Sequence, residues 1–374
     1  MNLAALDRLN DLSRSLKLDA LLLSDVHSLA WLTGYAPAIQ SGPNPFDAGP
    51  GLGWLEEGEL QIITSDGDAA GFLAQGASVR TYPGFTLDHP LDPVEKQMTV
   101  LDELWHHISS RPIRIGVEFD MLAAEPYSKL LSSCPDATIN KIDHDVKILR
   151  QLKTASEIVR IRSACALCDV AQAYVRNRAH AGQTEIALWA GAKGQLEIEA
   201  GERIPAYPEF VAGPRAGNVG DLPSTYQLQS GDCLRFDLVA RHNAYWGDNC
   251  ATVFVDEPST QLKQIHQIVL DALKRGIDAI KPGLPAAELD HLMRDYIIAA
   301  GYPSYPHHSG HGVGTAYHEE PRIVPGNSTQ LEAGMVIALE PAIYLEEIGG
   351  VRLEHTLLVT VDGHDLLTQH FHFN

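Results

Sequence analysis

The sequence has little positive charge and no long apolar segment. Its 374 residues include 28 lysines and arginines against 48 aspartates and glutamates, which gives a formal net charge of -20. Phosphate backbones repel such a chain, so we expect no nucleic-acid partner. No run of 18 or more apolar residues occurs, and the N-terminus lacks the basic and apolar segments of a signal peptide. We therefore expect a cytoplasmic protein with no membrane partner.

Cysteine is also scarce, with five residues in the chain. An odd number without a regular framework argues against a disulfide-stabilised secreted fold and favours a reducing compartment. Cys165 and Cys168 form a C-x-x-C pattern, but the pattern lies inside a helical periodicity rather than at a helix start. We interpret both as buried residues of a helix face, not as a redox site.

The length predicts two domains. In residues 1–148, helical and strand patterns alternate, which predicts an α/β domain with a mixed sheet. A glycine- and proline-rich stretch, residues 41–54, is predicted to be a loop, and it lacks a phosphate-binding lysine. The expected strands are 19–24, 60–64, 113–117 and 138–142, with a helix near 96–108.

Residues 149–374 form the second predicted domain. Thr154 and Glu157 make a capping-box pattern at the start of a long helix. Further helices are expected at 184–201, 260–280 and 285–300, and strands at 233–239, 250–255, 335–340 and 351–360.

Two hairpins of this domain each carry a pair of acids. If the first turn centres on His242 and Asn243, Asp237 lies directly opposite Asp248, with Cβ atoms roughly 4.5–5.5 Å apart. If the second turn centres on Glu347, counting outward from that residue along both strands places Glu340 opposite Glu354.

The four acids lie at the ends of, or within, nearly continuous apolar runs, which are typical of buried strands. Buried carboxylates without a positive partner are costly, and divalent metal ions supply that partner. Carboxylate oxygens with one imidazole suit manganese, cobalt, iron(II) or zinc.

A histidine candidate lies between the hairpins, in the segment "GHGVGTAYHEEP" (310–321). This segment is similar to the zinc-protease pattern H-E-x-x-H, but Arg322 stands where the second histidine is required. We therefore interpret His311 as the ligand of the segment, with glycines that let the backbone pass close to the metal. Glu319 and Glu320 are expected to be structural or supporting residues.

These residues resemble the pita-bread metallohydrolases, which comprise methionine aminopeptidases, Xaa-Pro aminopeptidases, prolidases and creatinases. The N-terminal segment "DALLLSDVHSLAWLTGY" is similar to the Xaa-Pro aminopeptidase and prolidase branch. The resemblance implies an α+β protein with a C-terminal pita-bread fold, a curved antiparallel sheet flanked by helices. It also implies an N-terminal creatinase-like (ribonuclease H-like) α/β domain.

The resemblance also implies two divalent metal ions, held by Asp237, Asp248, His311, Glu340 and Glu354. In the family pattern Asp248 and Glu354 bridge the ions, a metal-bridging hydroxide attacks the scissile carbonyl, and Glu340 is the general base.

Other residues are implied to contact the substrate. His318 and Arg352 match catalytic and substrate-binding positions, and His307 matches a substrate-pocket histidine. Tyr344 matches a family tyrosine that we interpret as a packing residue. We assign no role to His308.

One position departs from the family pattern. Most members have a histidine seventeen residues before the first aspartate, and here that position is Gly220. Asn218 or Asp221 are candidates to replace it. His355 also stands where an aspartate usually follows the last glutamate.

Three functions are compatible with this reading. The first is hydrolysis of an amide bond by an Xaa-Pro dipeptidase (prolidase) or an Xaa-Pro aminopeptidase, with a small peptide substrate and a homodimeric assembly. The second is hydrolysis of a non-peptide C–N bond in a small metabolite, as in a creatinase or a cyclic-amidine hydrolase. The third is a binding module without activity, which the complete ligand set disfavours.

Overall fold

The computed structural model describes residues 1–37, 46–110 and 112–370. The chain forms two compact units, Met1–Arg150 and Gln151–Asn374. The sequence placed the division at 148/149, which lies inside the helix α6 (Asp143–Gln151).

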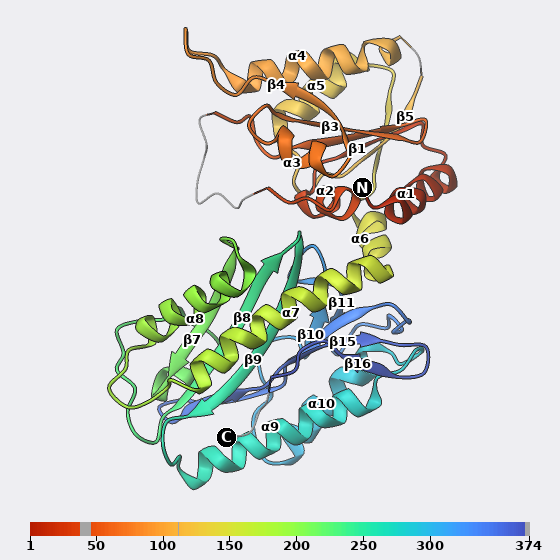
Figure 1. Ribbon diagram of the computed structural model, residues 1–374. Helices are drawn as coiled ribbons and strands as arrows, with labels where there is room; N and C mark the ends of the chain where they lie inside the picture. Colours follow the sequence, from red (N-terminus) through yellow and green to blue (C-terminus); the bar gives the residue numbers. More distant parts are fainter. Residues whose placement is uncertain (38–45, 111, 371–374) are drawn as a thin grey trace. The chain divides into compact units, whose positions relative to one another are not determined.

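The first unit contains a six-stranded mixed sheet in the order β4-β3-β2-β1-β5-β6 (Figure 1). The pairs β1–β2 and β2–β3 are antiparallel, and the other pairs are parallel, which confirms the predicted mixed sheet. The strands are β1 (Ala20–Leu23), β2 (Leu52–Glu56), β3 (Glu59–Ser65), β4 (Ser78–Tyr82), β5 (Arg114–Val117) and β6 (Thr138–Lys141).

Strand β2 corrects the predicted loop over 41–54. Its residues Leu52 and Trp54 are buried against the sheet neighbours, so apolar burial outweighs the local abundance of glycine. Residues 41–45 lie outside the part of the chain that the structure describes.

Two apolar cores form in this unit, and β1 contributes to both because its side chains alternate between the faces. Leu21 and Leu23 belong to one core, and Ala20 and Leu22 belong to the other. The helices are α1 (Leu3–Leu16), α2 (Val26–Thr33), α3 (Ala69–Ala74), α4 (Pro93–Trp105), η1 (His106–Ile108), α5 (Ala124–Ser133) and α6.

The second unit begins with α7 (Ala155–Arg176), whose start the capping box predicted. The Thr154 hydroxyl accepts from the Glu157 amide at 3.4 Å, and the Glu157 carboxylate accepts from the Thr154 amide at 2.9 Å. Cys165 and Cys168 are buried free thiols on this helix, as expected.

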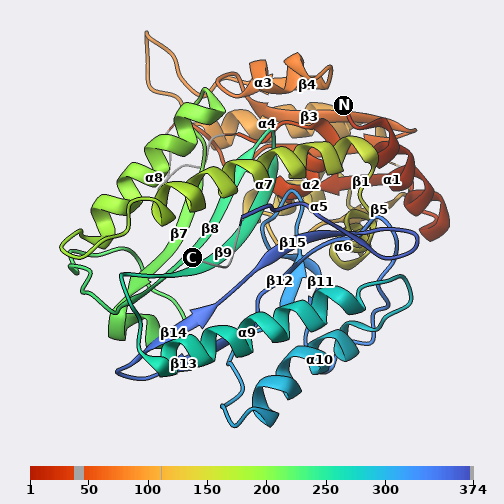
Figure 2. The ribbon, with the colours of Figure 1, turned by 60° about the horizontal axis from the view of Figure 1, so that its bottom comes forward.

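Helices α7 and α8 (Glu185–Ala200) cover a three-stranded antiparallel sheet (Figures 1 and 2). Its order is β7-β8-β9, with β7 (Ala206–Ala212), β8 (Cys233–His242) and β9 (Tyr245–Phe254). The short helix η2 (Gly213–Gly217) follows β7.

A second group of helices and strands completes this unit. Helices α9 (Thr260–Ala279) and α10 (Ala286–Ala299) lie on the other side of the strands from α7 and α8 (Figure 2). A bridge between Cys250 and Glu354 joins the two groups of strands. The strands are β10 (Gly310–Gly312), β11 (Glu319–Ile323), β12 (Val336–Leu339), β13 (Ala342–Leu345), β14 (Gly349–Arg352), β15 (His355–Val359) and β16 (His364–Leu366). Antiparallel strands flanked by helix pairs confirm the expected α+β pita-bread unit.

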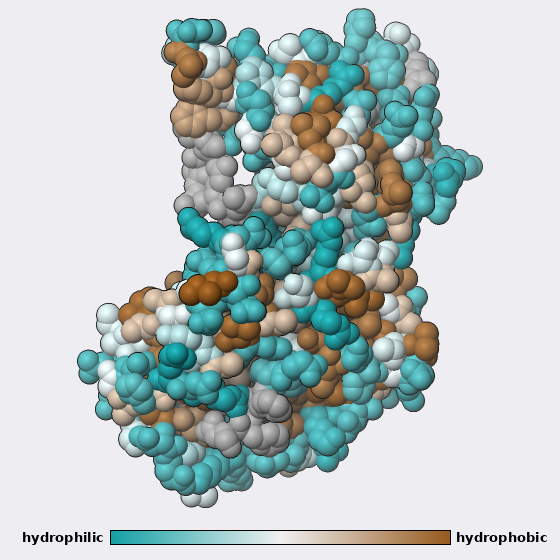
Figure 3. Space-filling view, in the orientation of Figure 1, coloured by the Kyte–Doolittle hydropathy of each residue, from teal (hydrophilic) through white to brown (hydrophobic). Residues whose placement is uncertain are grey.

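Within the described residues, every helix is too short or too polar to cross a membrane. On the face of the molecule that Figure 3 shows, hydrophobic residues form small groups among hydrophilic ones.

Candidate metal centre

The register of β8 and β9 differs from the predicted one. Asp237 lies opposite Cys250, and Asp248 lies opposite Val239, so the two aspartates are diagonal neighbours rather than a direct pair. The cause is the turn, whose two central residues with positive φ are Asn243 (51°) and Ala244 (70°). Diagonal positions on one face are roughly 7–8 Å apart, which leaves room between the carboxylates for an ion.

The register of the second hairpin agrees with the prediction. Ala342 pairs with Arg352 and Leu345 with Gly349, so the turn centres on Glu347, which has a φ of 64°. Glu340 directly follows β12, and Glu354 lies between β14 and β15, directly before His355. Both are buried, with 6% and 1% of their surface exposed.

The strand β10 holds His311 between β11 and β12. A β-carbon at Gly312 would lie 2.3 Å from the Glu320 carbonyl oxygen, and one at Gly310 would lie 2.1 Å from the Ala338 oxygen. The glycines are therefore required by the close approach of the neighbouring strands.

The His311 ring is oriented for ligation through Nε2. Its Nδ1 lies 2.9 Å from the Gly312 carbonyl oxygen, which fixes the proton on Nδ1. Its Nε2 faces two carboxylates, with Asp248 Oδ2 at 3.5 Å and Glu340 Oε1 at 3.6 Å. Burial lowers the pKa of His311 to about 3, so the ring is neutral, as a metal ligand must be.

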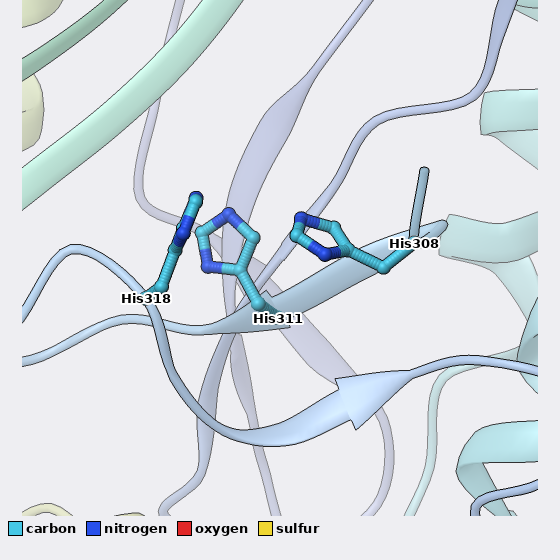
Figure 4. Close-up of side chains that lie close together, drawn as sticks. All are labelled: His308, His311 and His318. Atoms are coloured by element: carbon cyan, nitrogen blue, oxygen red, sulfur yellow. The ribbon is translucent and has the colours of Figure 1, made fainter. Parts of the chain in front are cut away.

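His308 is a member of the site that the sequence did not identify. Figure 4 shows the His311 ring between those of His308 and His318, with centroid distances of 5.1 and 4.2 Å. His308 Nε2 lies 2.9 Å from Glu340 Oε1. Its position three residues before His311 is the only feature of the sequence that links it to the site.

Burial acts strongly on the acids of this site. It raises the pKa of Asp237 to about 7, and it raises the pKa of Asp248 and Glu354 well above the ordinary values, with neighbouring carboxylates adding to the effect. Burial alone would also raise the pKa of Glu340. The hydrogen bond from His308 and the charge of Arg352 outweigh it, so the pKa of Glu340 is below its ordinary value.

These residues fit a divalent metal ion. One ligand atom each from Asp248, His311 and Glu354 lie within 4.8 Å of one another. Glu354 Oε2 is buried and has no hydrogen-bond partner among the described residues. An unpartnered carboxylate oxygen and several acids with raised pKa values are what a cation would satisfy.

Arg352 provides a fixed positive charge in the site. Its Nη2 pairs with the Glu209 carboxylate and lies 2.6 Å from Asp237 Oδ2. Its Nη1 donates to the Tyr344 hydroxyl at 3.3 Å, and that hydroxyl lies 2.9 Å from His307 Nε2. Tyr344 thus links two predicted substrate residues, which is more than the packing role inferred from the sequence.

The space that a side chain at position 220 would enter is filled by the Glu209 carboxylate, not by Asn218 or Asp221, the residues proposed from the sequence. Asp221 pairs with Arg215 at 2.8 Å and is exposed, and Asn218 lies outside the cavity at the metal-ligand candidates. A β-carbon at Gly220 would lie 2.5 Å from the Glu209 carboxylate. No motif of the sequence pointed to Glu209.

Glu319 has a structural role, in line with the sequence analysis. Its carboxylate pairs with Lys153 at 3.1 Å, and both side chains are buried. It also accepts from the Ala316 amide at 3.1 Å, which fixes the loop before His318.

All eight residues predicted for the site line one cavity of about 350 Å³ in the second unit. A volume of this size is typical of sites for small ligands. The lining residues are Tyr207, Pro208, Glu209, Val219, Asp237, Val239, Asp248, His307, His308, His311, Tyr317, His318, Glu340, Arg352 and Glu354.

The fold and this cavity define a metal-dependent peptidase of the pita-bread type. The model of metallopeptidase family M24 matches residues 159–361, and that of the creatinase/prolidase N-terminal domain matches residues 6–152. The chain belongs to metallopeptidase family M24, in the branch that carries this N-terminal domain, which confirms the expected membership.

Individual relatives support this assignment. The chain is 38% identical to "Xaa-Pro dipeptidase" of Pyrococcus furiosus over 231 residues, 61% of this chain and 66% of that protein. It is 30% identical to "Uncharacterized peptidase YqhT" of Bacillus subtilis, over 97% of both chains. The structure of "Xaa-Pro dipeptidase from Bacillus anthracis" is similar with a TM-score of 0.85 and 27% identity, covering 100% of this chain and 99% of that chain.

Proposed function

We propose that the chain is a two-metal hydrolase of the amide bond that precedes proline, an Xaa-Pro dipeptidase or aminopeptidase. The observation that carries the proposal is the convergence of three buried acids, the partly buried Asp237 and the Nε2 face of His311 on one cavity. Relatives named as Xaa-Pro dipeptidases support a peptide substrate over a small non-peptide metabolite.

Two divalent ions would be held by Asp237, Asp248, His311, Glu340 and Glu354. When bound, the ions would activate water and polarise the scissile carbonyl group. Manganese, cobalt, zinc and iron(II) all suit this set of oxygen and imidazole ligands.

The side chains around the ligands have separate tasks. The Glu340 carboxylate, kept ionised by its neighbours, would take the proton as the general base. His318, at the exposed edge of the cavity, would contact the substrate carbonyl as it becomes tetrahedral, and His307 and Arg352 would orient the substrate.

The rim of the cavity suits an apolar residue such as proline. Tyr207 and Tyr317 line the cavity, and both pack on Trp246, with ring centroids at 5.9 and 5.2 Å. These rings offer a rigid apolar wall near the metal ligands.

A hydrolysis screen tests the proposal. Xaa-Pro dipeptides and Xaa-Pro-Yaa tripeptides are incubated with the protein and each of the four metals, with Xaa-Ala peptides as the control. Cleavage of the proline peptides alone supports the proposal, and equal cleavage of the alanine peptides contradicts the specificity. Light scattering on the same sample tests the expected homodimer.

A further inference from the structure

The carboxylate of Glu209 occupies the space above Gly220, inside the catalytic cavity. A β-carbon at Gly220 would lie 2.5 Å from Glu209 Cδ and 2.5 Å from its Oε1, so any larger residue there would displace the acid. The backbone around Gly220 is held in place. The buried Arg235 donates to the Asn218 and Val219 carbonyl oxygens at 2.9 and 2.7 Å. The Phe210 backbone amide donates to the Asp221 carbonyl oxygen at 3.0 Å.

Glu209 belongs to β7 and lies directly opposite Asp237 on β8. The Glu209 side chain is 42% exposed, whereas that of Arg352 is 4% exposed. Both carboxylates pair with the same Nη2 atom of Arg352. Glu209 is therefore the outermost member of a charged group that reaches from the ligand Asp237 to the open part of the cavity.

The charged residues of the cavity show how Glu209 changes the charge that a substrate meets. Five carboxylates line it, and Arg352 is the one arginine or lysine among the described lining residues. Under the proposed function, two divalent ions offset the four ligand carboxylates. The Glu209 carboxylate then neutralises the guanidinium, which would otherwise present a fixed positive charge to a substrate anion.

We propose that Glu209 determines which group this cavity accepts at the carboxyl end of the substrate's proline residue, next to the leaving nitrogen. The Glu209 carboxylate is paired with the guanidinium of Arg352. A free carboxylate on the proline residue of the substrate therefore meets the Glu209 carboxylate instead of an available cation. Substrates in which this group is an uncharged amide are preferred. Such substrates are peptides that continue beyond the proline.

This inference rests on the proposed function and selects its aminopeptidase form over the dipeptidase form. The test compares kcat/KM for an Xaa-Pro dipeptide and for the amide of the same dipeptide. In the first the carboxyl-terminal group of proline is charged, and in the second it is neutral. Wild-type protein is expected to prefer the amide. Preference for the free dipeptide overturns the inference and leaves the proposed peptidase function intact.

The variants Glu209→Gln and Glu209→Asp separate the charge of Glu209 from its packing. Glu209→Gln is expected to raise the dipeptide-to-amide ratio of kcat/KM by about tenfold, mainly through a lower KM for the dipeptide, because the guanidinium becomes available. Glu209→Asp keeps the charge and should keep the ratio near the wild-type value. A ratio that Glu209→Gln leaves unchanged overturns the inference, and metal content shows whether the site is intact.

A binding measurement works without turnover. Calorimetric titration of the metal-loaded wild-type protein with L-proline and with L-prolinamide compares the same two groups. Tighter binding of prolinamide supports the role of Glu209, even if a failed hydrolysis screen has removed the proposed function. Tighter binding of proline contradicts that role.

Discussion

Glu209 and Asp237 lie directly opposite each other on β7 and β8, and their carboxylates pair with the same nitrogen of Arg352. Two carboxylates in such a position repel each other unless a cation lies between them. Arg352 is that cation, so the outer acid, the guanidinium and the ligand candidate form one unit. A change at any of the three is expected to affect the other two.

The variant Gly220→His tests whether Glu209 replaces the missing histidine. Its β-carbon meets the Glu209 carboxylate, so the imidazole can enter the cavity only if the acid moves away. We expect Gly220→His combined with Glu209→Ala to cleave Xaa-Pro dipeptides at least about tenfold faster than Gly220→His alone. Glu209→Ala alone is the control, and equal rates for the double and single His variants would contradict the replacement.

Glu354→Gln is expected to remove metal from the protein. Its Oε2 has no hydrogen-bond partner among the described residues, and a neutral amide satisfies a metal ion poorly. We expect metal content, measured by mass spectrometry, to fall by at least about one ion per chain, with hydrolysis reduced by about 100-fold or more. The matched control is Glu320→Gln, in a carboxylate outside the cavity, which should retain its metal.

The stability of the metal-free protein should decrease as the pH rises. Burial raises the pKa of Asp237 to about 7, and the pKa values of Asp248 and Glu354 are raised as well. A group with a raised folded-state pKa stabilises the fold fully below its unfolded pKa, and that contribution is lost as the pH rises through the folded value. Bound metal compensates the ionised acids and removes this loss.

The measurement is the melting temperature from pH 5 to pH 8, with chelator and with saturating metal. The difference between the two samples is expected to widen as the pH rises. A difference that stays constant or narrows would show that the pKa values of these acids are not raised in the metal-free fold.

Gly312→Ala is expected to destabilise the protein by about 2 kcal/mol or more, because its β-carbon would lie 2.3 Å from the Glu320 carbonyl oxygen and the strands cannot separate freely. Gly326→Ala, where nothing lies within 4 Å, is the matched control and should change the stability by less than about 0.5 kcal/mol. Denaturant unfolding measures both. Equal effects would contradict the close approach that positions His311.

The sequence predicted the parts of the site that local pattern determines. The Glu340 and Glu354 hairpin has a glycine-rich turn whose centre can be found by counting, and the structure has the same centre at Glu347. The capping box at Thr154 is likewise local, since it depends on residues three positions apart.

The features that the sequence predicted wrongly or missed depend on backbone conformation or on the pairing of strands that are far apart in the sequence. The β8–β9 turn shifted by one residue because Ala244 adopts a positive φ, which an alanine rarely does and no pattern indicates. Glu209 was missed because its strand returns to β8 through residues 213–232, and the register across such a long connection cannot be counted. Local spacing alone could not link Glu209 to Arg352.

Bound divalent metal and proline-peptide hydrolysis are expected to share one site. The most direct measurement is to strip the protein with chelator and titrate it with Mn²⁺ or Co²⁺ while recording both bound metal and Xaa-Pro hydrolysis. We expect no hydrolysis in the stripped protein and full recovery as binding approaches two ions per chain. Hydrolysis that persists without metal, or full metal binding without hydrolysis of any proline peptide, would contradict it.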